Sequence, residues 1–194
     1  RHDNYLTQLL RTATYGTLPA SLGNGLIAYA KENEAKRAEM LPRLTSAIDG
    51  AYGSLYAPLE KEVLTAQLNL YATKAAEYGL APKVAEMKAA NNGDFTNDVH
   101  KAVTSSIFTS KDAVLAFLKE PKVETITNDP LYVISNDLMT KIRAKSPEQA
   151  KADDDFAIAF RKLVEGLRES KLNTIQYPDA NSTLRLTYGK VRSL

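Results

Sequence analysis

Most of the chain carries apolar residues at helical spacing, and one stretch near the C-terminal end alternates like a β-strand. Apolar side chains at intervals of three and four residues form one face of an α-helix. We predict a helix from near Pro58 to Gly79, one entered through Asp129 and Pro130, and one beginning at Ser146 and Pro147. Their apolar stripes are Leu64, Leu68, Tyr71, Ala75 and Tyr78; Leu131, Ile134, Leu138 and Ile142; and Ala152, Phe156, Ala159, Phe160, Leu163 and Leu167.

Two further helices are predicted with shorter stripes. One holds Ala113, Val114, Phe117 and Leu118, and Pro121 follows it. In the other, Leu22, Leu26 and Tyr29 share a face, but Gly23 and Gly25 lie among them. Because glycine has a low helix propensity, we expect these two residues to weaken that helix.

Charged and alanine-rich sequence follows from Lys31 to Glu39 and predicts a surface helix. This helix either continues through Met40 and Pro42 or restarts after them. The clearest internal break is 91–93, Asn-Asn-Gly. It is interpreted either as a loop within one helical bundle or as a seam between two small helical lobes.

The pattern changes near the C-terminus, where residues 183–188 read Thr-Leu-Arg-Leu-Thr-Tyr. Leu184, Leu186 and Tyr188 fall on one face of an extended segment, which is typical of a half-buried strand. A single strand needs a sheet to satisfy its backbone groups. The sequence therefore predicts a mainly α protein with a helical domain over residues 1–176. A strand segment over 177–194 is expected to pair with a sheet that this chain lacks.

Composition narrows the classes of function. The 194 residues are 44% apolar and a quarter charged, which is typical of a folded globular chain. A net charge of +2 gives no field that favours nucleic acid. No apolar run reaches the length of a membrane span, and the absence of cysteine excludes disulfides and thiolate metal sites. The chain opens on Arg1, so we expect that sequence before it was removed.

No residue pattern predicts a catalytic or metal centre. The two histidines, His2 and His100, do not form a spacing typical of metal ligands, and no serine lies in a nucleophile motif. Gly53-Ser54 is interpreted as a turn between helices. We therefore predict no catalytic residue, no metal and no cofactor within the chain, and we assign no substrate-binding residue.

Three short motifs favour structural roles instead. Asp153, Asp154 and Asp155 diverge by about 100° per residue around a helix, so we expect them to complement the helix dipole rather than hold a cation. The segment 23–25, Gly-Asn-Gly, is too short for a phosphate-binding loop. The sequon at 181–183 applies only to secreted eukaryotic proteins.

The block from Tyr177 to Gly189, YPDANSTLRLTYG, resembles bacterial serine dipeptidyl aminopeptidases of the dipeptidyl-peptidase 7 and dipeptidyl-peptidase 11 group. The resemblance implies a chymotrypsin-like double β-barrel with a large helical insert. In such enzymes the block lies where the chain leaves the helical insert and re-enters the barrel. This implies that residues 1–176 are the helical cap and that the catalytic triad lies outside this chain.

By the same resemblance, the parent protein removes dipeptides from the N-terminus of oligopeptides in the periplasm or outside the cell, and it could form a homodimer. The cap would limit access to peptide ends and exclude water from the reaction site. Changes near 91–93 or 23–25 are expected to alter peptide-length selectivity. The alternative is a free-standing helical module that binds a protein or peptide in a groove; a stand-alone hydrolase is a third, weaker hypothesis.

Overall fold

The computed structural model describes residues 13–76, 79–144 and 147–170. Within them it contains nine α-helices, one short 3-10 helix and no strand. The mainly α fold class is therefore confirmed, while the C-terminal strand and the boundary at residue 177 lie outside the described residues. The helices are α2 (Thr14–Lys31), α3 (Glu34–Tyr52), α4 (Ala57–Lys74), α5 (Pro82–Ala90), α6 (Thr96–Ser105), η2 (Ile107–Thr109), α7 (Lys111–Phe117), α8 (Val123–Thr127), α9 (Pro130–Arg143) and α10 (Pro147–Glu169).

The chain divides into two compact units, residues 1–144 and 145–194. The first unit contains α2 to α9, and the described part of the second is α10. None of the described helices is both long enough and apolar enough to cross a membrane.

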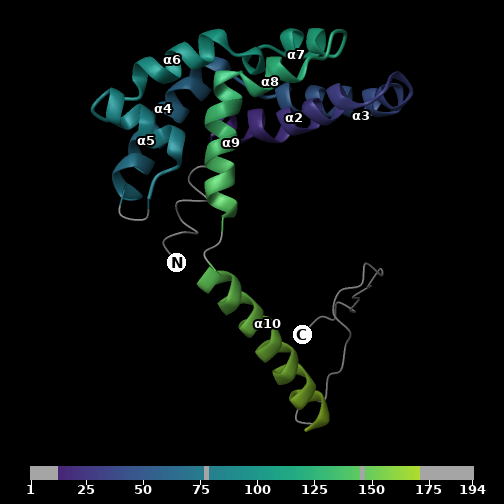
Figure 1. Cartoon of the computed structure of the whole chain (residues 1–194), viewed down its shortest axis with the longest axis vertical. Helices are drawn as coiled ribbons and strands as arrows, with labels where there is room; N and C mark the ends of the chain where they lie inside the picture. The colour runs from purple at the N-terminus through teal and green to yellow at the C-terminus, as the bar shows by residue number, and fades with distance from the viewer. Residues whose placement is uncertain (1–12, 77–78, 145–146, 171–194) are drawn as a thin grey trace, which may run out of the picture. The chain divides into compact units, whose positions relative to one another are not determined.

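Helix α9 contributes to two hydrophobic clusters of the first unit. In Figure 1 it runs between α4, α5 and α6 on one side and α2, α3, α7 and α8 on the other. It contributes Leu131, Ile134 and Leu138 to a cluster formed with α4, α5 and α6. It contributes Tyr132 to a second cluster formed with α2, α3, α7 and α8. Because α9 packs into both clusters, a shift of this helix would disturb the packing of both.

Helix α2 packs along α9 and also reaches both clusters. Tyr15 lies in the first cluster, whereas Leu22, Leu26 and Tyr29 lie in the second. The two glycines do not interrupt this helix, and the expectation that they weaken it stays a prediction. A Cβ atom at Gly23 would lie 2.5 Å from Cδ2 of Tyr132, so glycine permits the close approach of α2 and α9.

Helix α4 begins where the sequence predicts but ends at Lys74, five residues before Gly79. Leu64, Leu68, Tyr71 and Ala75 are buried as one stripe, whereas Tyr78 lies outside the described residues. Because the helix ends early, the chain returns toward it, and the Ala81 N–H donates to the Tyr71 hydroxyl over 3.0 Å. Gly79 takes a positive φ of 77° in this return.

The remaining predicted helices form close to their expected positions. Helix α3 continues through Pro42, which is exposed, so water can satisfy the carbonyl that proline leaves without a donor. The segment 91–93 is a turn between α5 and α6, with Asn92 at a φ of 52°. Val84 before this turn and Val99 after it belong to the same cluster.

Candidate functional site

The described residues hold no assembled nucleophile and base around a histidine. His100 lies exposed on α6, where its backbone carbonyl accepts a hydrogen bond from the Thr104 hydroxyl. His2 lies outside the described residues. Among the residues that the structure describes, no three His, Asp or Glu side chains converge to hold a metal ion.

One buried serine and one buried aspartate do meet. Ser106 Oγ donates to Asp129 Oδ1 over 2.8 Å, and both residues are less than a tenth exposed. The serine oxygen in turn accepts the Phe108 N–H over 3.0 Å. A nucleophile must reach an accessible carbonyl, and this hydroxyl is buried and already makes two hydrogen bonds.

Asp129 instead joins two segments of backbone. Its Oδ1 caps α9 by accepting the N–H groups of Leu131 and Tyr132, each over 3.0 Å, while Oδ2 accepts the Ile107 N–H over 2.9 Å. With the Ser106 hydroxyl, four donors surround one carboxylate. Such bonding compensates for the loss of hydration when a charge is buried.

Tyr52 lies near this carboxylate, and Tyr15 lies near Tyr52. We call Asp129, Ser106, Tyr52 and Tyr15 together the polar junction. Burial, the neighbouring Tyr15 and the charge of Asp129 all raise the pKa of Tyr52. Its hydroxyl donates to the Phe108 carbonyl over 2.7 Å. Burial and the charge of Glu60 raise the pKa of Tyr15, which is fully buried. In the polar junction both tyrosines are therefore neutral and Asp129 is the one carboxylate. Its hydrogen bonds hold α9 and η2 together.

A carboxylate from α4 holds the beginning of α2. Thr14 donates its N–H to Glu60 Oε2 and its hydroxyl to Glu60 Oε1, both over 2.9 Å. The residue before α2, Ala13, has no side chain that could cap the helix. Glu60 supplies this missing cap from a distant part of the sequence.

The first unit has a surface groove between α2 and α3 with a volume of about 510 Å³. Apolar side chains form most of its walls, and the guanidinium-bearing Arg43 stands among them. This combination could accept an apolar peptide segment with a carboxylate nearby. The lining residues are Leu18, Ser21, Leu22, Gly25, Met40, Arg43, Leu44, Ala47 and Ala51.

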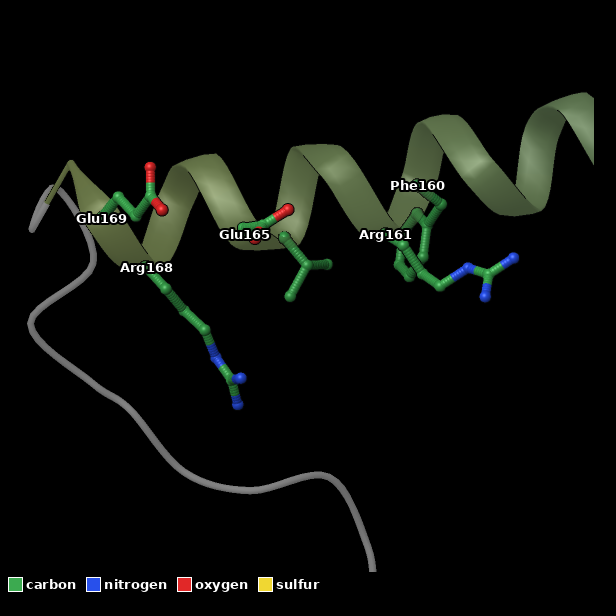
Figure 2. A pocket seen from close by; sticks show the side chains of 6 residues that line it. Phe160, Arg161, Glu165, Arg168 and Glu169 are labelled. Atoms are coloured by element: carbon green, nitrogen blue, oxygen red, sulfur yellow. The ribbon is translucent and has the colours of Figure 1, made fainter.

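The second unit presents an apolar face on α10. Phe156, Phe160 and Leu163 are 71%, 55% and 58% exposed. The rings of Phe156 and Phe160 stack with centroids 6.1 Å apart. A pocket lies along this helix, and Figure 2 shows that its lining side chains come from α10 itself.

Two of the motifs singled out in the sequence are each part of a regular helix. The segment 23–25 is inside α2, where it forms no loop. Asp153, Asp154 and Asp155 are exposed on α10, and Asp155 pairs with Lys151 over 2.5 Å. Because they begin seven residues into α10, they lie beyond the first turn, where the helix dipole acts most strongly.

The polar junction is the feature that sequence reasoning missed. The Asp129-Pro130 pair does indicate a helix start, because aspartate is a preferred N-cap and proline suits the first helical position. No sequence signal links Asp129 to Ser106, since that contact depends on how the two segments pack.

Comparison with known proteins places this helical assembly in a family. The family model for peptidase S46 matches residues 6–194. The chain is 36% identical over 162 residues to a dipeptidyl-peptidase 7 of Capnocytophaga gingivalis, covering 84% of this chain and 22% of that protein. It is 31% identical over 136 residues to an Asp/Glu-specific dipeptidyl-peptidase of Porphyromonas gingivalis, covering 70% of this chain and 19% of that protein.

A dipeptidyl-peptidase 7 of Phocaeicola vulgatus is 32% identical over 138 residues, with 70% of this chain and 19% of that protein covered. The chain thus spans about a fifth of the length of these relatives. No solved structure matches it. The match over 6–194 confirms the resemblance read from the C-terminal block, and the chain belongs to the peptidase S46 family.

Proposed function

We propose that the parent of this chain is a serine-type dipeptidyl peptidase that releases dipeptides from the N-terminus of oligopeptides. The family match over residues 6–194 carries this proposal. Relatives named as dipeptidyl-peptidases, which share up to 36% identity with the chain, support it. The match also favours this function over a free-standing binding module.

Within that parent, this chain serves as part of the helical cap and contributes no member of the catalytic triad. The two hydrophobic clusters sharing α9, together with the polar junction, support a structural role for the first unit. A cap of this kind would obstruct the path of longer peptides beyond the cleaved bond and would exclude water from the reaction site. A periplasmic or secreted location and a homodimeric parent are further parts of the proposal.

The activity is tested with the full-length parent and an oligopeptide whose products are identified by mass spectrometry. We expect successive release of intact dipeptides from the free N-terminus. The matched control is the same peptide with an acetylated N-terminus, which should not be cleaved. Release of single amino acids, or equal internal cleavage of both peptides, would overturn the proposal.

The role of the cap is tested at the exposed turn between α5 and α6. A four-residue insertion after Asn92 should change the ratio of kcat/KM between short and long peptides, because it enlarges the turn without touching the core. The control Asn92→Gly keeps a residue that tolerates the observed φ of 52°, and it should leave the ratio unchanged. An insertion variant with the parental ratio would show that this turn does not govern peptide length.

A further inference from the structure

Helix α10 carries a continuous apolar stripe that no other described residue of its own unit covers. Phe156, Phe160, Leu163 and Leu167 follow one another at intervals of four, three and four residues. That spacing places them on one face over about three turns. All four side chains are at least two-fifths exposed, and Val164 extends the stripe on one side.

Two arginines form one border of this stripe. Arg161 and Arg168 each follow a stripe residue directly and are separated by seven residues, so both lie on the same edge of the helix. Glu165 lies between them on that edge, so the border carries two positive charges and one negative charge. Figure 2 shows both guanidinium groups projecting on the side of Phe160, while Glu169 projects the other way. Within the described residues no ion pair joins either arginine to a carboxylate, and Arg161 Nε donates only to the Ala157 carbonyl over 3.2 Å.

The stripe and its border have the composition of a docking surface. Folded proteins seldom leave a contiguous set of large apolar side chains in water, since covering it stabilises the protein. Arginine at the rim of such a surface pairs readily with carboxylates in a bidentate arrangement. The surface that covers α10 is therefore expected to be apolar at its centre and acidic along one side.

The length of the relatives points to a source for that cover. This chain spans 22% of one relative and 19% of two others, so about four-fifths of a protein of that size lies outside residues 1–194. We propose that the apolar face of α10, with Arg161 and Arg168 at its edge, docks onto an apolar, carboxylate-bordered surface in that remaining polypeptide. The proposal rests on family membership and length and is independent of the peptidase activity.

Cysteine labelling tests this directly, because the chain has no cysteine of its own. Phe160→Cys places a thiol on the stripe, and Ala157→Cys places one beside it while keeping all the large apolar side chains. Lys162→Cys, two residues beyond Phe160 and therefore on the far side of the helix, is the matched control. Each variant is labelled with a maleimide in the 194-residue chain and in the full-length parent, at two protein concentrations. Mass spectrometry of the α10 peptide reports the rate at that site alone.

We expect the thiols at 157 and 160 to react about tenfold more slowly in the parent than in the 194-residue chain, at both concentrations, while the thiol at 162 reacts equally in both. Equal rates at 160 in both proteins would overturn the proposal. Slow labelling only at the higher concentration would assign the face to a second copy, and slow labelling in the shorter chain itself would assign it to the chain's own helices; either result overturns it.

The acidic border is tested by Arg161→Glu combined with Arg168→Glu in the Ala157→Cys parent. We expect this double change to bring the labelling rate close to that of the isolated chain, because like charges would then face each other. Labelling that stays slow would contradict the carboxylate border. Dipeptide release measured on the same samples separates failure of docking from failure of the proposed activity.

Discussion

Gly23 of α2 lies directly against the ring of Tyr132 of α9, so that a Cβ atom at position 23 would come within 2.5 Å of Tyr132 Cδ2 and 3.1 Å of Ile126 Cγ2. Alanine has a higher helix propensity than glycine by about 1 kcal/mol, but overpacking of this kind costs about 1–3 kcal/mol. We expect Gly23→Ala to lower the free energy of unfolding in urea, because the rigid ring cannot move aside without disturbing the second cluster.

Gly25 provides the matched control on the same helix. A Cβ atom there would lie 3.5 Å from Leu44 Cδ2, which is an ordinary contact. Gly25→Ala should therefore leave the protein as stable or raise the free energy of unfolding by up to about 1 kcal/mol. Equal effects at the two positions would contradict the close approach of α2 and α9.

Replacing the carboxylate of the polar junction should be costly. Asp129→Ala removes the acceptor for four donors, three of them backbone N–H groups. We expect a loss of about 3 kcal/mol in the free energy of unfolding. Asp129→Asn keeps one acceptor oxygen and should have an intermediate effect. Asp112→Ala, at an exposed position on α7, should change stability by only about 0.5 kcal/mol. If Asp129→Ala lowers the free energy of unfolding no more than Asp112→Ala, the structural role of the Asp129 carboxylate is contradicted.

Alkaline pH should destabilise the first unit through its tyrosines. Burial raises the pKa of Tyr52, and also of Tyr15, Tyr71 and Tyr132, above the ordinary value of 10.0. Above about pH 10 the unfolded chain releases these phenolic protons while the folded chain retains them, so the unfolded state binds fewer protons and stability falls. The stabilisation is fully present below about pH 10.

Urea unfolding below and above about pH 10 checks this prediction. Tyr52→Phe should flatten the decline, although it also lowers stability at every pH by about 1 kcal/mol through loss of the bond to the Phe108 carbonyl. Tyr56→Phe is the control, because Tyr56 is 65% exposed. If the Tyr52→Phe and Tyr56→Phe variants lose stability equally with rising pH, burial of Tyr52 is not the cause.

Glu60 should contribute more to the free energy of unfolding than the exposed Glu62 on the same helix. Glu60→Ala leaves the N–H and hydroxyl of Thr14 without their acceptor, and we expect a loss of about 1–2 kcal/mol in urea unfolding. Glu62→Ala removes an exposed ion pair with Lys61 and should cost less than about 0.5 kcal/mol. The same loss at both positions would mean that Glu60 does not cap α2.

The sequence predicted the helices because their apolar spacing is a local property. The stripes containing Leu68, Leu138 and Val114 are buried as expected. What the sequence could not predict depends on contacts between distant segments. From the sequence alone Gly23 looks like a helix-weakening residue, and only the structure shows that it packs against Tyr132. Likewise, nothing in the sequence distinguishes Ser106, whose hydroxyl donates to Asp129 in the structure. The stripe of α10 has the same spacing as the buried ones, and only the structure shows that it is exposed.

We propose above all that this chain is cap structure within a dipeptidyl peptidase and supplies none of its chemistry. The most direct measurement compares the purified 194-residue chain with the full-length parent on the same chromogenic dipeptidyl substrates. We predict steady release of the chromophore by the parent and no release above the blank by the chain at equal concentration. Turnover by the chain alone, or none by the folded parent on any dipeptidyl substrate, would contradict the account.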